Sequence, residues 1–189
     1  MQLNYRNYGS GEPLFILHGL FGSSDNWQTL GKKFSVYFQV FLIDLRNHGH
    51  SPHSSDFSYD LMADDINEII NKEKLKKVTV IGHSMGGKVA MRAVQKFPFH
   101  FEKLIVADMG VKKYPKHHQQ IIAGLKSIDL KTTNTRTEAR NILASYVKDE
   151  GVQQFLLKNL YWENKNQLAW RMNLAVLIKK MNEILIEIP

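Results

Sequence analysis

Short apolar runs alternate with amphipathic segments over residues 1–110. The runs lie at 14–17, 40–43, 78–81 and 104–107, and each stops at a polar residue or a glycine. Runs of this length, rich in β-branched and aromatic residues and apolar on both faces, are typical of buried parallel strands. We therefore expect four such strands that end at one edge of a sheet.

Segments with helical periodicity lie between these runs. Apolar residues recur at spacings of three and four over 62–70 and over 89–97, where Pro98 ends the second stripe. A shorter helix is expected to start near Asp25, and residues 3–8 predict a half-exposed antiparallel edge strand. Strands that alternate with helices indicate a mostly parallel α/β sheet covered on both faces.

After Pro115 the pattern becomes mostly helical, with one short extended piece expected near 168–170. The helical stripes fall at 121–125, 139–146, 155–160 and 177–185. We therefore divide the chain into an N-terminal core, 1–110, and a helical cap, 111–189.

The amino-acid composition excludes several classes of protein and of functional site. A chain of 189 residues without cysteine excludes a disulfide-stapled fold, a thiolate metal site and a cysteine nucleophile. The N-terminus has no apolar leader and no apolar stretch is long enough to span a membrane, so a cytoplasmic protein without a membrane partner is expected. Residues 111–189 hold 13 Lys/Arg against 7 Asp/Glu within a net charge of +7. No nucleic-acid motif accompanies this charge, so a solvated basic face is favoured over nucleic-acid binding.

The strongest chemical signal is GHSMGGK at 82–88, which lies between the run 78–81 and the stripe 89–97. A G-x-S-x-G segment between a strand and a helix forms a tight elbow that exposes the serine hydroxyl. The start of the helix then directs free N–H groups and a positive dipole end toward a developing oxyanion. Ser84 is therefore the candidate nucleophile, in preference to a purely structural glycine-rich turn.

A second motif, HGLFGS at 18–23, follows the run 14–17. In enzymes with such an elbow, a loop in this place supplies the second oxyanion donor, so the N–H groups of Leu20 and Met85 are expected to form the oxyanion hole. His18 could instead be the catalytic base. Its place at a strand end favours a structural hydrogen-bonding role.

Together with DLRNHGHS at 44–51, these motifs resemble the α/β-hydrolase family and, within it, the capped esterase and thioesterase branch. The resemblance covers residues 1 to about 160. It implies a mostly parallel sheet with a helical cap, and a serine-hydrolase mechanism without metal or cofactor. In that mechanism Ser84 attacks the substrate, forms an acyl-enzyme and loses the acyl group to water.

Two aspartates end strands. Asp108 follows the run 104–107 and is the candidate triad acid, with a turn-capping role as an equal alternative. Asp44 is expected to be structural, through a local ion pair with Arg46.

No histidine of the sequence is a convincing candidate for the catalytic base. The resemblance places the catalytic histidine after the cap and beyond two further strands, whereas the last histidine here is His118. The full set is His18, His48, His50, His53, His83, His100, His117 and His118. His117 and His118 are expected at the surface, and His83 is expected to point away from Ser84. The C-terminal strands of the family are thus expected to be missing, which would leave an unpaired apolar edge on the strand 104–107 and impair catalysis.

The leading functional hypothesis is a hydrolase that cleaves carboxylic esters or acyl thioesters of small acyl groups. A basic cap would favour anionic acyl donors such as coenzyme A thioesters. Five large cap side chains could line an acyl pocket, although ordinary packing is favoured for each: Phe155, Leu156, Leu160, Trp162 and Trp170. The alternatives are a C–C hydrolase or lyase on the same fold, and a non-catalytic truncated hydrolase.

Overall fold

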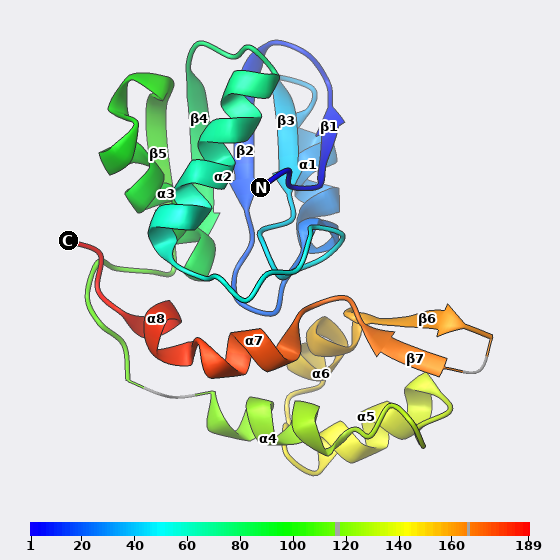
Figure 1. Ribbon diagram of the computed structural model, residues 1–189. Coiled ribbons are helices and arrows are strands. Elements are labelled where there is room, and N and C mark those ends of the chain that lie inside the picture. The colour runs from blue at the N-terminus through cyan, green and yellow to red at the C-terminus, as the bar shows by residue number, and fades with distance from the viewer. Residues whose placement is uncertain (116–117, 166) are drawn as a thin grey trace.

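The computed structural model describes residues 1–115, 118–165 and 167–189, and its centre is a five-stranded sheet (Figure 1). The order of the strands is β1-β3-β2-β4-β5. Their bounds are β1 Tyr5–Tyr8, β2 Glu12–Leu17, β3 Phe38–Ile43, β4 Val78–His83 and β5 Phe101–Ala107. Strand β1 runs antiparallel to β3, and the β2–β3, β2–β4 and β4–β5 pairs are parallel. The predicted mostly parallel sheet with an antiparallel edge is therefore confirmed.

Helices cover both faces of this sheet. Figure 1 shows α2 and α3 in front of the strands and α1 behind them. The bounds are η1 Ser24–Trp27, α1 Gln28–Phe34, α2 Tyr59–Lys72, α3 Met85–Lys96 and η2 Pro98–His100. The helix α2 begins at Ser58, whose side chain accepts a hydrogen bond from the Leu61 amide, and its apolar stripe is buried against the sheet.

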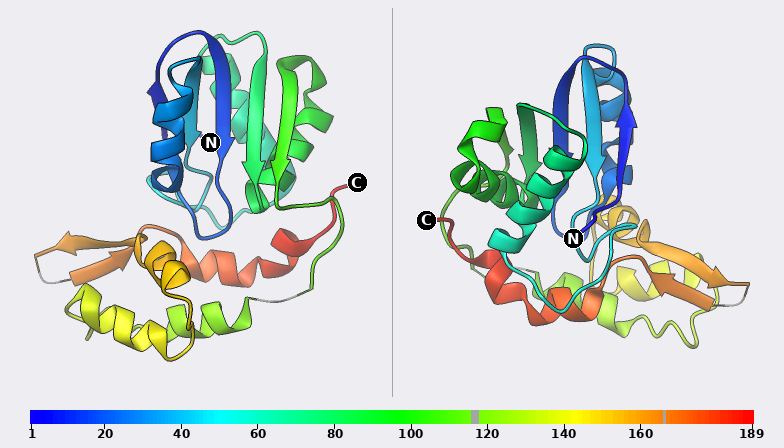
Figure 2. Two further views of the ribbon diagram at one scale, coloured as in Figure 1. Left: turned by 180° about the vertical axis from the view of Figure 1, so that it is seen from behind. Right: turned by 45° about the horizontal axis from the view of Figure 1, so that its top comes forward.

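Residues after β5 form a layer across the carboxyl ends of the parallel strands (Figures 1 and 2). Its elements are α4 Gln119–Ser127, α5 Arg136–Ala144, α6 Glu150–Leu157, β6 Leu160–Asn164, β7 Gln167–Trp170, α7 Leu174–Lys179 and α8 Met181–Leu185. We call residues 111–189 the cap segment.

Two expectations for the cap segment were wrong in detail. Leu160 does not continue the helical stripe of Phe155, because it starts β6, and β6 pairs with β7 as an antiparallel hairpin. The side chain of Asn159 donates hydrogen bonds to the Leu156 and Phe21 carbonyls, which ends α6 and fixes it to the core. The stripe 177–185 is likewise divided into two short helices at Lys180.

A buried carboxylate organises the loops at the carboxyl edge of the sheet. Asp44 is fully buried and accepts hydrogen bonds from the Ser24 amide at 2.7 Å, the His50 amide at 3.0 Å and the Asn4 side chain at 2.8 Å. Burial alone would raise the pKa of Asp44, but these hydrogen bonds and the proximity of His18 hold the pKa below its usual value. Asp44 thus has the structural role expected of it.

The expected ion pair between Asp44 and Arg46 does not form. Arg46 instead makes a two-point contact with Asp65 on α2, with its Nε 2.7 Å and a terminal nitrogen 2.9 Å from the two carboxylate oxygens. Both side chains are buried, and the N-terminal ammonium of Met1 lies 2.9 Å from the same carboxylate. The sequence pointed to the wrong partner because Asp65 is close only after α2 packs on the sheet.

We expect Asp65→Ala to lower the free energy of unfolding by about 3–5 kcal/mol, because it leaves the Arg46 guanidinium buried without its partner. The matched control is Asp64→Ala, which removes a half-exposed carboxylate paired with Lys96 and should cost less than about 1 kcal/mol. Urea unfolding of both variants measures the difference. Equal losses in the two would show that the buried pair contributes no more than the exposed one.

Strand β5 forms one edge of the described sheet and exposes apolar side chains. Leu104 is 39% exposed and Ile105 is 48% exposed, as expected for an edge without a second neighbour. Open apolar edges promote pairing between chains. We expect the 189-residue chain to self-associate at micromolar concentration and Ile105→Lys to reduce this, as measured by light scattering after size exclusion. A monomeric, soluble parent chain would contradict this expectation.

Candidate functional site

Ser84 occupies a strained turn between β4 and α3. Its φ of 51° is unusual for a residue with a side chain, and its carbonyl accepts the Gly87 amide at 2.8 Å as α3 begins. A Cβ on Gly82 would lie 2.3 Å from the Gly86 carbonyl oxygen, and one on Gly86 would lie 2.5 Å from the Leu17 carbonyl oxygen. Glycine at both positions is therefore what allows the turn to close, and the predicted elbow is present.

The loop after β2 lies beside this elbow. Gly22 donates to the Gly19 carbonyl at 3.0 Å, and Phe21 is held at a φ of 60°. Among the described residues, the amides of Leu20 and Met85 take part in no loop or turn hydrogen bond. Met85 is the first residue of α3, where N–H groups lack helical acceptors. Both residues border one cavity with Ser84, as a two-donor oxyanion site requires.

Two buried imidazoles fasten this loop to the segment after β3. His18 makes a 2.8 Å hydrogen bond to the Gly19 carbonyl through Nδ1 and accepts the Leu45 amide at 3.0 Å through Nε2. His48 bonds the Arg46 carbonyl through Nδ1, and its Nε2 lies 3.3 Å from the Phe21 nitrogen. Burial lowers the pKa of His18 and lowers that of His48 to about 3, so both rings are neutral. His18 is therefore structural, as expected.

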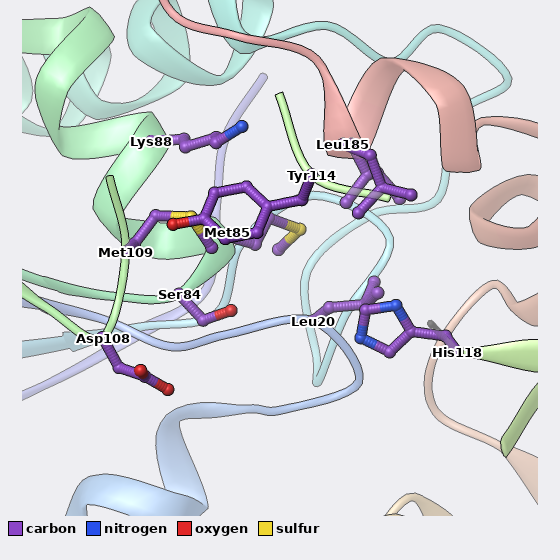
Figure 3. Close-up of a pocket in the computed structure, with 10 residues that line it drawn as sticks. Leu20, Ser84, Met85, Lys88, Asp108, Met109, Tyr114, His118 and Leu185 are labelled. Carbon is purple, nitrogen blue, oxygen red and sulfur yellow. The ribbon is translucent and has the colours of Figure 1, made fainter. Parts of the chain in front are cut away.

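The Ser84 cavity has a volume of about 200 Å³, and its walls combine apolar and polar side chains (Figure 3). Figure 3 shows Ser84 between Asp108 on one side and the Lys88–Tyr114 pair on the other. The lining residues are Leu20, Ser84, Met85, Lys88, Asp108, Met109, Tyr114, His118, Ile184 and Leu185. All four candidate site residues thus meet at one cavity.

Asp108 follows β5 at a φ of 54° and is exposed. In the described part of the chain, its carboxylate makes no hydrogen bond and no ion pair. The alternative that it caps a turn through its side chain therefore finds no partner in the structure. The carboxylate is available to a group that approaches the cavity.

The histidines near Ser84 divide between two cavities. His83 lines a separate cavity of about 290 Å³, with its ring 6.1 Å from that of Trp27, so it points away from Ser84 as expected. His118 was expected at the surface, but it is half-buried, borders the Ser84 cavity and meets the Phe21 ring edge-on. His117 lies outside the described residues. Within those residues, no imidazole hydrogen bonds to the Ser84 hydroxyl.

The large cap side chains singled out from the sequence do not line the Ser84 cavity. Trp162 is 46% exposed, Leu156 and Leu160 are buried in the core, and Phe155 lines the cavity of His83. The packing interpretation holds for the two leucines.

Sequence reasoning missed Lys88 and Tyr114 as residues of the Ser84 cavity. Lys88 could have been found, because it lies one helical turn after Ser84, whereas Tyr114 reaches the cavity only through tertiary contacts.

Neither a metal site nor a spanning helix is found in the described ranges. No group of three or more acidic or histidine side chains there could hold a metal ion. None of the helices described is both long and apolar enough to cross a bilayer.

Comparison with known proteins agrees with this geometry. A putative esterase/lipase from Haemophilus influenzae is 39% identical over 91% of this chain, which spans 60% of that relative's length. Esterase YbfF from Escherichia coli is 33% identical, with coverage of 94% of this chain and 70% of the esterase. A solved structure described as a marine microorganism esterase is 44% identical. The match covers 100% of this chain and 75% of the esterase chain, with a TM-score of 0.97.

The family profile described as alpha/beta hydrolase fold matches residues 12–147. This match covers most of the sheet, the elbow and the first half of the cap segment. The chain belongs to the alpha/beta hydrolase fold family.

Proposed function

We propose that this protein is a serine hydrolase that cleaves carboxylic esters or acyl thioesters of small acyl groups, with Ser84 as its nucleophile. The observation that carries the proposal is the strained elbow, which presents the Ser84 hydroxyl to a cavity bordered by Leu20 and Met85. Among the described residues, the amides of Leu20 and Met85 make no loop or turn hydrogen bond. The names of the relatives, among them two esterases and an esterase/lipase, support ester cleavage over the C–C hydrolase or lyase alternative.

The chemistry proceeds in two acyl transfers. The Ser84 oxygen attacks the substrate carbonyl while a base accepts the hydroxyl proton, and the carbonyl oxygen gains negative charge that the Leu20 and Met85 amides stabilise. Collapse of this intermediate breaks the bond to the alcohol or thiol, which leaves with the proton from the base. Water then attacks the acyl-enzyme in the same way, releasing the carboxylic acid and restoring Ser84.

In this proposal Asp108 orients the base. Its exposed carboxylate at the end of β5 borders the same cavity as Ser84 and has no partner among the described residues. The family resemblance assigns the base to a histidine that follows the cap, so we expect residues 1–189 alone to hydrolyse esters slowly. In the non-catalytic alternative, the rate of ester hydrolysis by residues 1–189 is zero.

Substrate size and charge follow from the walls of the cavity. A volume of about 200 Å³, with leucine, isoleucine and methionine side chains on part of the wall, suits a short acyl chain. The excess of basic residues in the cap segment raises the positive potential over the cavity, which favours anionic acyl donors. Small-molecule esters are the partners that the relatives' names imply, and a cytoplasmic location without nucleic-acid or membrane partners stays a prediction from the sequence.

We expect Ser84→Ala to abolish labelling by a fluorophosphonate probe and to reduce p-nitrophenyl acetate hydrolysis at least about a hundredfold, because the probe and the ester need the same oxygen. Ser145→Ala is the matched control, since that serine is exposed at the end of α5 and should label and hydrolyse like the parent. In-gel fluorescence and intact mass report the labelling. Undiminished labelling of Ser84→Ala would exclude Ser84 as the nucleophile.

A preference for anionic esters is tested with two acyl chains of equal length, one ending in a methyl group and one in a carboxylate. We expect the anionic ester to have the higher kcat/KM at low salt and to lose this advantage at about 1 M salt, because ions screen the basic surface. Lys113→Ala in the cap should weaken the preference, whereas Lys33→Ala on α1 should not. Equal efficiencies with the same salt response would contradict the basic-cap hypothesis.

A further inference from the structure

The cap segment joins the core through two stretches that run side by side, as Figure 1 shows near the C-terminus. We call residues 110–115 the incoming stretch and residues 184–188 the outgoing stretch. The Tyr114 amide donates to the Leu185 carbonyl at 2.9 Å, and the Ile188 amide donates to the Val111 carbonyl at 2.8 Å. These reciprocal bonds make the two stretches one antiparallel unit.

Lys88 fastens this unit to α3. Its side chain is fully buried, and its Nζ donates to the Lys112 carbonyl at 3.0 Å and to the Ile186 carbonyl. One acceptor therefore comes from each stretch. The ammonium also lies 5.1 Å from the centre of the Tyr114 ring, whose hydroxyl accepts the Gly110 amide at 2.8 Å.

The charge of Lys88 has no carboxylate partner within hydrogen-bonding distance among the described residues. Burial lowers the pKa of Lys88, and the more distant Glu187 offsets this only in part. Burying an ammonium without a charged partner costs free energy. Fold stability therefore gives little reason for a lysine here, whereas two divergent main-chain acceptors need a donor with several N–H bonds.

The same two stretches form one wall of the Ser84 cavity. Tyr114 comes from the incoming stretch, and Ile184 and Leu185 come from the outgoing stretch. Figure 3 shows Tyr114 between Ser84 and Lys88, with Leu185 beyond the ring. Whatever holds this unit against α3 therefore sets the distance between that wall and the serine.

We propose that Lys88 is a positioning residue that clamps the incoming and outgoing stretches onto the helix that begins at Ser84, and thereby sets the width of the acyl cavity. Ser84 and Lys88 are one helical turn apart, so the rigid backbone of α3 fixes the clamp relative to the nucleophile. If other parts of the cap segment move, the distance between this wall and Ser84 then stays the same. The role of the cavity as an acyl site rests on the function proposed above. The clamp itself does not depend on that function.

Hydrogen–deuterium exchange tests the clamp without any need for catalysis. In Lys88→Met, amides of 110–114 and 184–188 should exchange about five- to tenfold faster, since two hydrogen bonds that hold them are lost, while β4 and α2 stay unchanged. The melting temperature should fall by about 2–8 °C, since two carbonyl groups lose their donor while the fold is kept. Lys96→Met is the control, because it removes an exposed lysine from the same helix. Unchanged exchange in the two stretches of Lys88→Met would overturn the proposal.

Alkyl fluorophosphonates with short and long chains test the width of the cavity. The ratio of long-chain to short-chain labelling rates at Ser84 should rise at least about threefold in Lys88→Met and stay constant in Lys96→Met. A constant ratio despite faster exchange would overturn the role in selectivity. If no probe labels the parent chain, the proposed function fails, and exchange still decides the clamp.

If Lys88→Met does not fold, Tyr114→Leu provides the second variant. It keeps the lysine but removes the ring beneath the ammonium and the hydroxyl bond to Gly110. Faster exchange of the two stretches in a folded Tyr114→Leu protein would support the clamp, and parent-like exchange would overturn it.

Discussion

The site depends on one close approach of backbone to backbone, at the elbow of Ser84. The elbow brings the start of α3 against the ends of β2 and β4, at distances that leave no room for a Cβ at Gly82 or Gly86. This contact presents the Ser84 hydroxyl to the cavity and leaves the first amide of α3 beside the loop of Leu20. A single added methyl group at either glycine would have to displace main chain rather than a flexible side chain.

Around that contact, the carboxyl edge of the sheet is held by polar groups that are almost all satisfied by main chain. Asp44, His18 and His48 each bond a backbone N–H group of a loop that is distant in sequence, namely those of Ser24, Leu45 and Phe21. Such bonds specify loop conformation more sharply than apolar packing does, because each donor and acceptor has a direction. Lys88 extends the same principle to the cap, where its two acceptors are also carbonyl groups.

Patterns of neighbouring residues were sufficient to predict the central strands, the two helices packed on them and the nucleophile elbow. Apolar runs and helical stripes located β2 to β5, α2 and α3, and strand–turn–helix context located Ser84, because each signal is contained within a few neighbouring residues. In the hairpin after α6, the extended piece at β7 was expected, whereas β6 and the pairing of the two strands were missed, because the strands are short and the pairing is tertiary. The partner of Arg46 and the inward position of His118 were missed for a related reason, since charge and polarity along the chain carry no information about which distant element will lie opposite.

The two neutral imidazoles of His18 and His48, which bond the loop that contains Leu20, lower the stability of the folded protein in acid. An unfolded chain would take up a proton at each ring near the ordinary histidine pKa of 6.5, whereas the folded protein holds both pKa values lower. Protons therefore bind the unfolded state more strongly, and the folded state loses stability as the pH falls below about 6.5. The loop that contains Leu20 is thus held by two groups whose protonation favours unfolding. Mild acidification should loosen this loop before the carboxylates of the surface begin to titrate.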